Sequence, residues 1–199
     1  VPEDIIHPSC KVIHLDTDPW EIGKNQPTDV GILSDIKNGL IELIQAVSRR
    51  MSPDDRAAAK ERVARIGEEN RQKREVVWER ADVDRGRIPI PDTQLMLELK
   101  EAIPRDAIIV DGGITSSMAL RNLLDFDDPT SYLAVRDNDG SLGDILPMTM
   151  GVKLARPDRP VIGVVGDGNA MYTIQGLWTA AHHQIPVIWV ICNNASYRI

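Results

Sequence analysis

Two short polar motifs interrupt the apolar C-terminal part of this sequence, and their residue types suit a divalent cation. Gly-Asp-Gly directly follows the apolar run "VIGVV", and Asn-Asn directly follows the run "VIWVIC". The carboxylate of Asp167 and the amide oxygen of Asn194 are hard donors, and Mg²⁺ binds such oxygens together with phosphate and water oxygens. Gly166 and Gly168 have no side chain, so a diphosphate can approach the backbone there. The residue types therefore indicate a joint site for Mg²⁺ and a diphosphate.

Each motif alone is more often an ordinary turn or loop than a binding site. Together they carry more weight, because they end consecutive predicted strands. If these strands are parallel neighbours, their connection is right-handed and both carboxyl ends lie at the edge where open parallel sheets bind ligands. The backbone N–H groups of Gly168 and Asn169 would face an anion there. A dinucleotide fingerprint starting at Gly166 is excluded, because Met171 stands where its third glycine would be.

The elements that position these motifs follow from the pattern of apolar residues. From Ile90 onward, short apolar runs alternate with segments whose apolar residues have helical spacing. Apolar strands separated by helices are typical of a parallel sheet covered by helices on both faces. We therefore predict an α/β fold. Its predicted strands are 107–111, 131–135, 160–168 and 185–194, and its predicted helices lie at 93–103, 115–124, 172–183 and within 140–155.

The first part of the sequence has a different pattern. Residues 10–16 alternate like a strand and 35–51 have helical spacing, so this part is predicted to be the end of a separate domain. In the charged stretch that follows, Ser52 can cap a helix and Pro53 suits its first position. Acids and bases nearly balance there, which favours a surface helix over a nucleic-acid-binding one. The predicted organisation is a domain end at 1–50, a charged helical linker at 51–89 and a diphosphate-binding domain at 90–199.

Composition argues against several classes of function. The chain has 199 residues, 42% hydrophobic content and a formal net charge of −7, as expected of a soluble protein of one or two domains. The negative charge and 4% aromatic content argue against nucleic-acid binding, and no apolar run approaches the ~20 residues of a membrane span. Cys10 and Cys192 are predicted to be reduced, buried thiols of a cytoplasmic protein. No secretory signal is recognisable, and we expect a part of a longer chain.

The motifs and their surroundings resemble the thiamine diphosphate-dependent enzymes, whose cofactor signature is Gly-Asp-Gly with a later Asn-Asn. The stretch "GSLGDILPMTMGVKLARPDRPVIGVVGDGNAMYTIQGLWTAAHHQIPVIWVICNNASYRI" resembles the diphosphate-binding domain of the benzoylformate decarboxylase and acetolactate synthase branch. The stretch "VIHLDTDPWEIGKNQPTDVGILSDIKNGLIELI" resembles the end of that family's middle domain. The resemblance implies the thiamine diphosphate-binding fold, preceded by the end of a second α/β domain.

The resemblance also implies which residues hold the metal and the diphosphate. The oxygen donors to Mg²⁺ would come from Asp167, the side chain of Asn194 and the backbone carbonyl of Ser196. The groups around the diphosphate would come from Gly166, Gly168 and Asn169.

Further residues would meet the rest of the cofactor. The resemblance implies that the Gly140 carbonyl accepts from the 4′-amino group of the aminopyrimidine. Leu142 would be the apolar wedge that keeps the cofactor bent. Ile114 and Thr115 match a segment that also lines the cofactor, and Tyr197 would pack near the metal end.

The activity implied is the thiamine diphosphate- and Mg²⁺-dependent, non-oxidative decarboxylation of a 2-oxo acid, through a C2 ylide and an enamine. The family's activating glutamate lies in an N-terminal domain of the partner subunit, so no catalytic residue is expected here and this stretch alone is predicted to be inactive. His182 and His183 are expected to be packing or surface residues. The implied assembly is a homodimer or homotetramer with its active site between subunits.

Two alternatives stay open. An acetolactate synthase-like transferase would join two 2-oxo acids, and only in that case is FAD expected. A non-catalytic module would keep the fold and the cofactor without the chemistry.

Overall fold

The computed structural model describes residues 6–7, 9–126, 128–134 and 142–196. The chain divides into two compact units, Val1–Gly67 and Glu68–Ile199. This division falls inside one long helix, α2 (Pro53–Val83). The domain boundaries predicted at 50 and 89 stay a prediction. Within the described ranges, no helix is long and apolar enough to cross a membrane.

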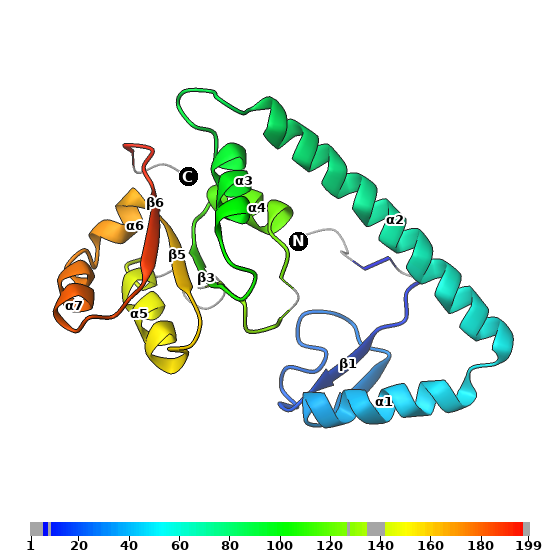
Figure 1. The fold of residues 1–199 in the computed structure, drawn as a ribbon. Coiled ribbons are helices and arrows are strands. Elements are labelled where there is room, and N and C mark those ends of the chain that lie inside the picture. The colour runs from blue at the N-terminus through cyan, green and yellow to red at the C-terminus, as the bar shows by residue number, and fades with distance from the viewer. Residues whose placement is uncertain (1–5, 8, 127, 135–141, 197–199) are drawn as a thin grey trace. The chain divides into compact units, whose positions relative to one another are not determined.

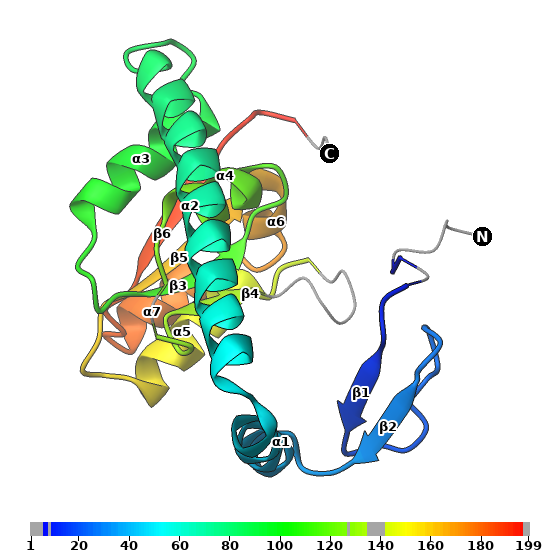
Figure 2. The same cartoon turned by 90° about the vertical axis from the view of Figure 1, so that its right-hand side faces the viewer.

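The first unit contains a two-stranded parallel sheet and an amphipathic helix (Figure 2). The helix starts where the Asp35 carboxylate accepts the Asn38 N–H at 2.9 Å, which satisfies one of the free N–H groups of its first turn. Gly39 lets the helix approach the sheet, because a Cβ there would come within 2.6 Å of Leu15 Cδ1. The elements are β1 (Ile13–Asp16), β2 (Val30–Leu33) and α1 (Ile36–Arg50).

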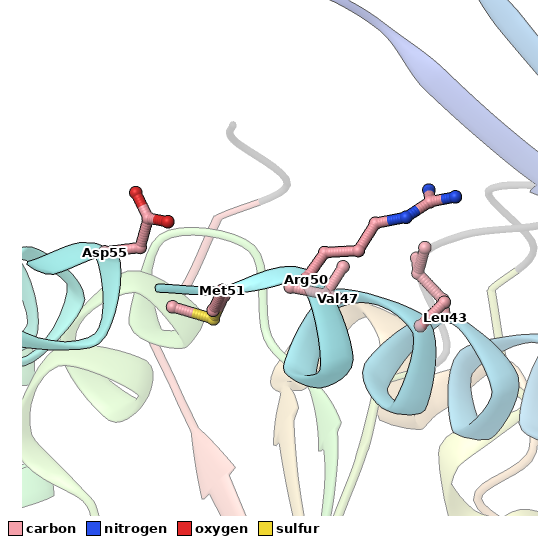
Figure 3. A pocket seen from close by; sticks show the side chains of 6 residues that line it. Leu43, Val47, Arg50, Met51 and Asp55 are labelled. Atoms are coloured by element: carbon pink, nitrogen blue, oxygen red, sulfur yellow. The ribbon is translucent and has the colours of Figure 1, made fainter. Parts of the chain in front are cut away.

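The junction between α1 and α2 is capped as the sequence predicts. Ser52 Oγ accepts the Asp55 N–H at 3.1 Å, and the Asp55 carboxylate accepts the Ser52 N–H at 2.9 Å. This reciprocal pair satisfies N–H groups at the start of α2. Figure 3 shows a hollow at the junction, with the Arg50 guanidinium and the Asp55 carboxylate pointing apart, so polar groups do not converge in it. Its lining consists of Leu43, Ala46, Val47, Arg50, Met51 and Asp55.

The second unit is built around a four-stranded parallel sheet in the order β4-β3-β5-β6. These four strands confirm the strands predicted from Ile90 onward, whereas β2 and the short helix α6 were not predicted. The strands are β3 (Ile108–Gly112), β4 (Tyr132–Ala134), β5 (Val161–Gly166) and β6 (Ile188–Cys192). The helices that follow α2 are α3 (Asp92–Ala102), α4 (Ser116–Leu123), α5 (Ile145–Ala155), α6 (Asp167–Met171) and α7 (Gly176–His182).

Helices cover both faces of this sheet, with α3 and α4 on one side and α5 on the other (Figure 1). Successive side chains of a strand point to opposite faces. Ile109 and Ile162 accordingly pack with Met96 of α3, while Val110 packs with Ile145 of α5. Because both faces bury apolar residues, the central strands are apolar except near the carboxyl end of β3, where Asp111 lies. The predicted α/β fold class is confirmed.

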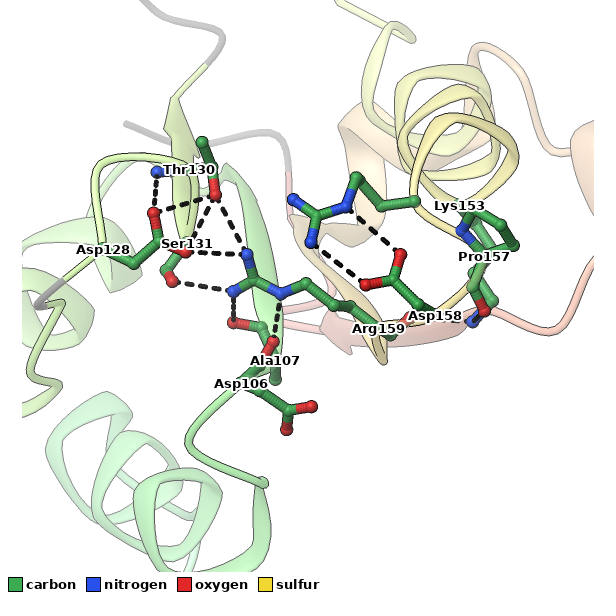
Figure 4. A network of polar contacts seen from close by, with 10 residues as sticks. Asp106, Ala107, Asp128, Thr130, Ser131, Lys153, Pro157, Asp158 and Arg159 are labelled. Atoms are coloured by element: carbon green, nitrogen blue, oxygen red, sulfur yellow. Dashed lines mark hydrogen bonds and ion pairs between the residues drawn. The ribbon is translucent and has the colours of Figure 1, made fainter.

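A buried arginine ties together the amino ends of three strands (Figure 4). Arg159 precedes β5 and is only 6% exposed. Its guanidinium donates to the Asp106 carbonyl at 2.5 Å, to Ser131 Oγ at 2.8 Å and to the Asp128 carboxylate at 2.8 Å. Asp106 precedes β3, while Asp128 and Ser131 precede β4. This network therefore lies at the edge opposite to the polar motifs.

The two cysteines differ in their surroundings. Both are free thiols, and Cys192 is half-buried at the end of β6. Cys10 is exposed, because it precedes β1 and lies outside the small sheet. The prediction of a buried thiol is therefore wrong for Cys10.

Candidate functional site

The two polar motifs leave the sheet at one edge and from paired positions. Gly166 ends β5 and is the register partner of Cys192, which ends the parallel neighbour β6. Asp167 and Asn193 are therefore the next residues of adjacent strands, and Asn194 follows directly. The predicted relation between these strands is confirmed.

The oxygen donors at this edge fit a metal that is held only in part by protein. Asp167 is half-buried and Asn194 is exposed. In the part of the chain that the structure describes, no group of three or more His, Cys, Asp and Glu side chains could hold a metal ion. The Asn194 Oδ1 atom accepts the Ser196 N–H at 3.0 Å and keeps a second lone pair. One carboxylate with amide and backbone oxygens fits Mg²⁺, which usually completes its shell with phosphate and water oxygens.

The space next to Gly166 is open, and carboxylates lie near this edge. A Cβ on Gly166 would meet no atom of the described residues within 4 Å, so the backbone is accessible there. Burial raises the pKa of the Cys192 thiol, a hydrogen bond with Ser116 lowers it, and the carboxylates of Asp92, Asp111 and Asp167 raise it. Carboxylates close to the strand ends favour a cation over an anion there.

The turn after β6 has a strained backbone. Ala195 has a φ of 51°, in the left-handed region that non-glycine residues rarely adopt. The Asn193 Oδ1 atom accepts the Ala195 N–H at 2.8 Å and supports this conformation. Strain of this kind persists only where neighbouring contacts impose it, and it is common at binding sites.

The segment at Leu142 is bonded to the residues that follow Asp167. The Gly143 N–H donates to Asn169 Oδ1 at 2.5 Å, and Thr173 Oγ1 donates to the Gly143 carbonyl at 2.6 Å. Leu142 directly precedes Gly143 and is half-buried. The structure thus joins the segment of the predicted wedge to that of the predicted diphosphate contacts.

Sequence reasoning missed a buried carboxylate at the end of β3. Asp111 is 1% exposed, and its oxygens accept the Gly113 N–H at 3.0 Å, Ser117 Oγ at 2.6 Å and the Tyr132 hydroxyl at 2.6 Å. These donors compensate for the loss of water around the charge. They also hold the turn that follows β3. The signal in the sequence was "IIVDGG", an acid that follows an apolar run just as in "VIGVVGDG".

The other predicted site residues fall into two groups. Ile114 and Thr115 are exposed and follow β3, the parallel neighbour of β5, at the same edge as Asp167. Gly140 and Tyr197 lie outside the described residues. The roles expected for all four stay predictions.

The fold and this edge define an open parallel α/β domain with carboxylate and amide oxygens where its strands end. Residues 111–199 match the family model described as thiamine pyrophosphate enzyme, C-terminal TPP binding domain. The chain is 28% identical over 198 residues to the acetolactate synthase large subunit of Parasynechococcus marenigrum, covering 96% of this chain and 29% of that protein. It is 39% identical over 94 residues to a benzoylformate decarboxylase of Pseudomonas aeruginosa, covering 47% of this chain and 17% of that protein.

A solved structure is similar over nearly the whole chain. The thiamine diphosphate-dependent 4-hydroxybenzoylformate decarboxylase of Rhodococcus jostii RHA1 superposes with a TM-score of 0.68 at 26% identity, covering 99% of this chain and 33% of that one. Residues 111–199 thus match the C-terminal domain of the thiamine pyrophosphate enzymes, and the relatives that the chain matches include acetolactate synthases and benzoylformate decarboxylases. The chain spans about a third of the length of the acetolactate synthases that it matches.

Proposed function

We propose that this chain forms the Mg²⁺- and diphosphate-binding part of a thiamine diphosphate-dependent enzyme that decarboxylates a 2-oxo acid. The observation that supports this most directly is the register pairing of Gly166 with Cys192. Through that pairing, a half-buried carboxylate and a pair of amides follow neighbouring strands at one edge of the sheet.

In this proposal the chain binds and orients the cofactor. Asp167, the Asn194 side chain and the Ser196 carbonyl would hold Mg²⁺, and Gly166 leaves open space beside them for the diphosphate. When bound, thiamine diphosphate would supply the nucleophilic carbon and the electron sink that decarboxylation of a 2-oxo acid requires. Leu142 would support the cofactor as an apolar contact. No residue of this chain is proposed to transfer a proton.

The second candidate is the joining of two 2-oxo acids, as in acetolactate synthases. It is favoured by the length of the match, because similarity to an acetolactate synthase covers 96% of this chain and that to a benzoylformate decarboxylase covers 47%. Decarboxylation is favoured by the higher identity of the shorter match, 39% against 28%. FAD is proposed as a further cofactor only under the second candidate.

Product analysis separates the two candidates. The protein that contains this chain is loaded with thiamine diphosphate and Mg²⁺ and supplied with one 2-oxo acid at a time. A decarboxylase releases CO₂ and the corresponding aldehyde, whereas a carboligase releases one CO₂ and joins the remaining carbons of that molecule to a second 2-oxo acid. Release of CO₂ from none of a broad panel of 2-oxo acids would contradict both.

The resemblance also supports a proposal on assembly and location. We propose a cytoplasmic homodimer or homotetramer, with each active site between subunits. Light scattering of the purified protein gives the mass, and a monomer that retains full activity would contradict the proposal.

A further inference from the structure

Both backbone polar groups of Gly143 are bonded to side chains from one short stretch after β5. The Gly143 N–H donates to Asn169 Oδ1 at 2.5 Å, and the Gly143 carbonyl accepts from Thr173 Oγ1 at 2.6 Å. Gly143 has a φ of +92°, and a Cβ at this position would lie 2.7 Å from Tyr172 Cβ. No other residue type fits this close approach without a shift of the backbone.

The other end of the Asn169 amide reaches a third segment. Its Nδ2 atom donates to the Gly112 carbonyl at the end of β3, at 3.4 Å. A primary amide accepts through its oxygen and donates through its nitrogen, so its two bonds start from separate atoms. An ionised carboxylate has no donor, and a hydroxyl would make both bonds through a single oxygen. Asn169 therefore links the end of β3, the Leu142–Gly143 segment and the start of α6.

This arrangement bridges the two ends of the proposed cofactor site. Asn169 stands two positions after Asp167, and Leu142 stands directly before Gly143. A change in the bonds of Gly143 would therefore move Leu142 relative to Asp167. Thr173 follows the end of α6 by two residues, and no contact with the cofactor is expected of it.

We propose that Asn169 and Thr173 are positioning residues that fix Leu142 relative to the metal ligands and so set the affinity for thiamine diphosphate. Asn169 acts through Gly143 and Gly112 in addition to any contact with the diphosphate. Thr173 acts only through the Gly143 carbonyl. This inference rests on the proposed function.

Thr173 carries the decisive test, because its proposed effect is indirect. Thr173→Val keeps the shape of the side chain and removes the donor to Gly143, whereas Thr173→Ser keeps the donor. Thr149→Val is the matched control, because Thr149 Oγ1 donates at the same 2.6 Å to a carbonyl of its own helix, that of Ile145. The dissociation constant of thiamine diphosphate at saturating Mg²⁺ is measured by calorimetry in the protein that contains this chain.

We expect Thr173→Val to weaken thiamine diphosphate binding about tenfold, the range of one lost hydrogen bond to a partly buried carbonyl. Thr173→Ser should restore the affinity, and Thr149→Val should leave it unchanged. The loss should raise the KM for thiamine diphosphate more than it lowers kcat at saturating cofactor. Equal affinities for Thr173→Val and Thr149→Val would overturn the inference.

A second measurement needs no cofactor. Hydrogen–deuterium exchange of the peptide that contains Gly143 reports the bond to Asn169 directly. Asn169→Ala should speed exchange of this amide at least tenfold, and unchanged exchange would also overturn the inference. Asp167→Ala separates this proposal from the previous one. If Asp167→Ala leaves the affinity for thiamine diphosphate intact, the proposed function fails. If Asp167→Ala abolishes this affinity and Thr173→Val leaves it unchanged, only the positioning role is contradicted.

Discussion

Gly166 and Cys192 end neighbouring parallel strands in register, so Asp167 and Asn193 leave the sheet at the same level. Neither Gly166 nor Cys192 is expected to bind the metal. Their pairing nevertheless places the Asp167 carboxylate and the two asparagine amides at the same edge of the sheet. The proposed Mg²⁺ site therefore depends on the pairing of β5 with β6.

The first prediction concerns the metal. Asp167→Ala and Asn194→Ala should each abolish Mg²⁺-dependent binding of thiamine diphosphate, because each removes an oxygen ligand from a sparse protein set. Calorimetry with Mg²⁺ and with EDTA measures the effect. Asp106→Ala, before β3, and Asn122→Ala, on α4, are the matched controls and should bind normally. Unchanged affinity in either site variant would contradict the ligand assignment.

The second prediction concerns the contact between β3 and α5. A Cβ on Gly112 would come within 2.0 Å of Ile145 Cγ1, and Ile145 is fully buried. Gly112→Ala should therefore lower the free energy of unfolding by roughly 1–3 kcal/mol. Gly151→Ala is the control, because Gly151 lies inside α5 and a Cβ there would meet no atom of the described residues within 4 Å. It should raise stability by about 0.5–1 kcal/mol. Urea denaturation measures both, and equal signs would contradict the packing described.

The third prediction compares two neighbouring arginines. Arg159→Met leaves the Asp106 carbonyl and other acceptors at the amino edge without their donor, so we expect a loss of roughly 2–4 kcal/mol in unfolding free energy. Among the described residues, the Arg156 side chain pairs with Asp158 alone, at 3.1 Å and in an exposed position, so Arg156→Met should change stability little. Thermal and urea unfolding measure the free energy of unfolding of both variants. Similar losses in the two variants would show that the buried Arg159 network adds no more stability than the exposed Arg156 pair.

The fourth prediction concerns acid. The Thr130 N–H and hydroxyl, followed by the Arg159 guanidinium, hold the pKa of Asp128 below its usual range. A carboxyl whose pKa is lowered on folding stabilises the protein above its unfolded pKa of about 3.9, and this contribution is lost as the pH falls through the folded pKa. The difference in stability between the wild type and Asp128→Asn should therefore be largest above pH 5 and shrink towards pH 3. A difference that does not depend on pH would contradict this.

Much of the second unit could be predicted because its strands are predominantly apolar and its helices have clear spacing. The same strands allowed the position of Asp167 and Asn194 at one edge of the sheet to be predicted, because the carboxyl ends of parallel neighbours lie at the same edge. β2 was missed because its four residues, "VGIL", are too few to show a period. The five-residue helix α6 was missed because Asp167 and Gly168 were assigned to the end of the preceding strand, 160–168.

The contacts between distant segments could not be predicted from the sequence. The bonds between Asn169 and Gly143 and between Arg159 and Asp128 depend on side-chain geometry that no local pattern encodes. In the sequence "RPDRP", Arg159 is indistinguishable from a solvated surface residue, although it is only 6% exposed.

The position of the Arg159 network has a consequence for how such a domain can diverge. The strands are fastened at their amino ends by a guanidinium, and the residues proposed to bind the cofactor stand at their other ends. Exchanges among these proposed binding residues therefore leave that fastening untouched. A descendant of this protein could acquire a new substrate at one end of the sheet while inheriting its stability from the other.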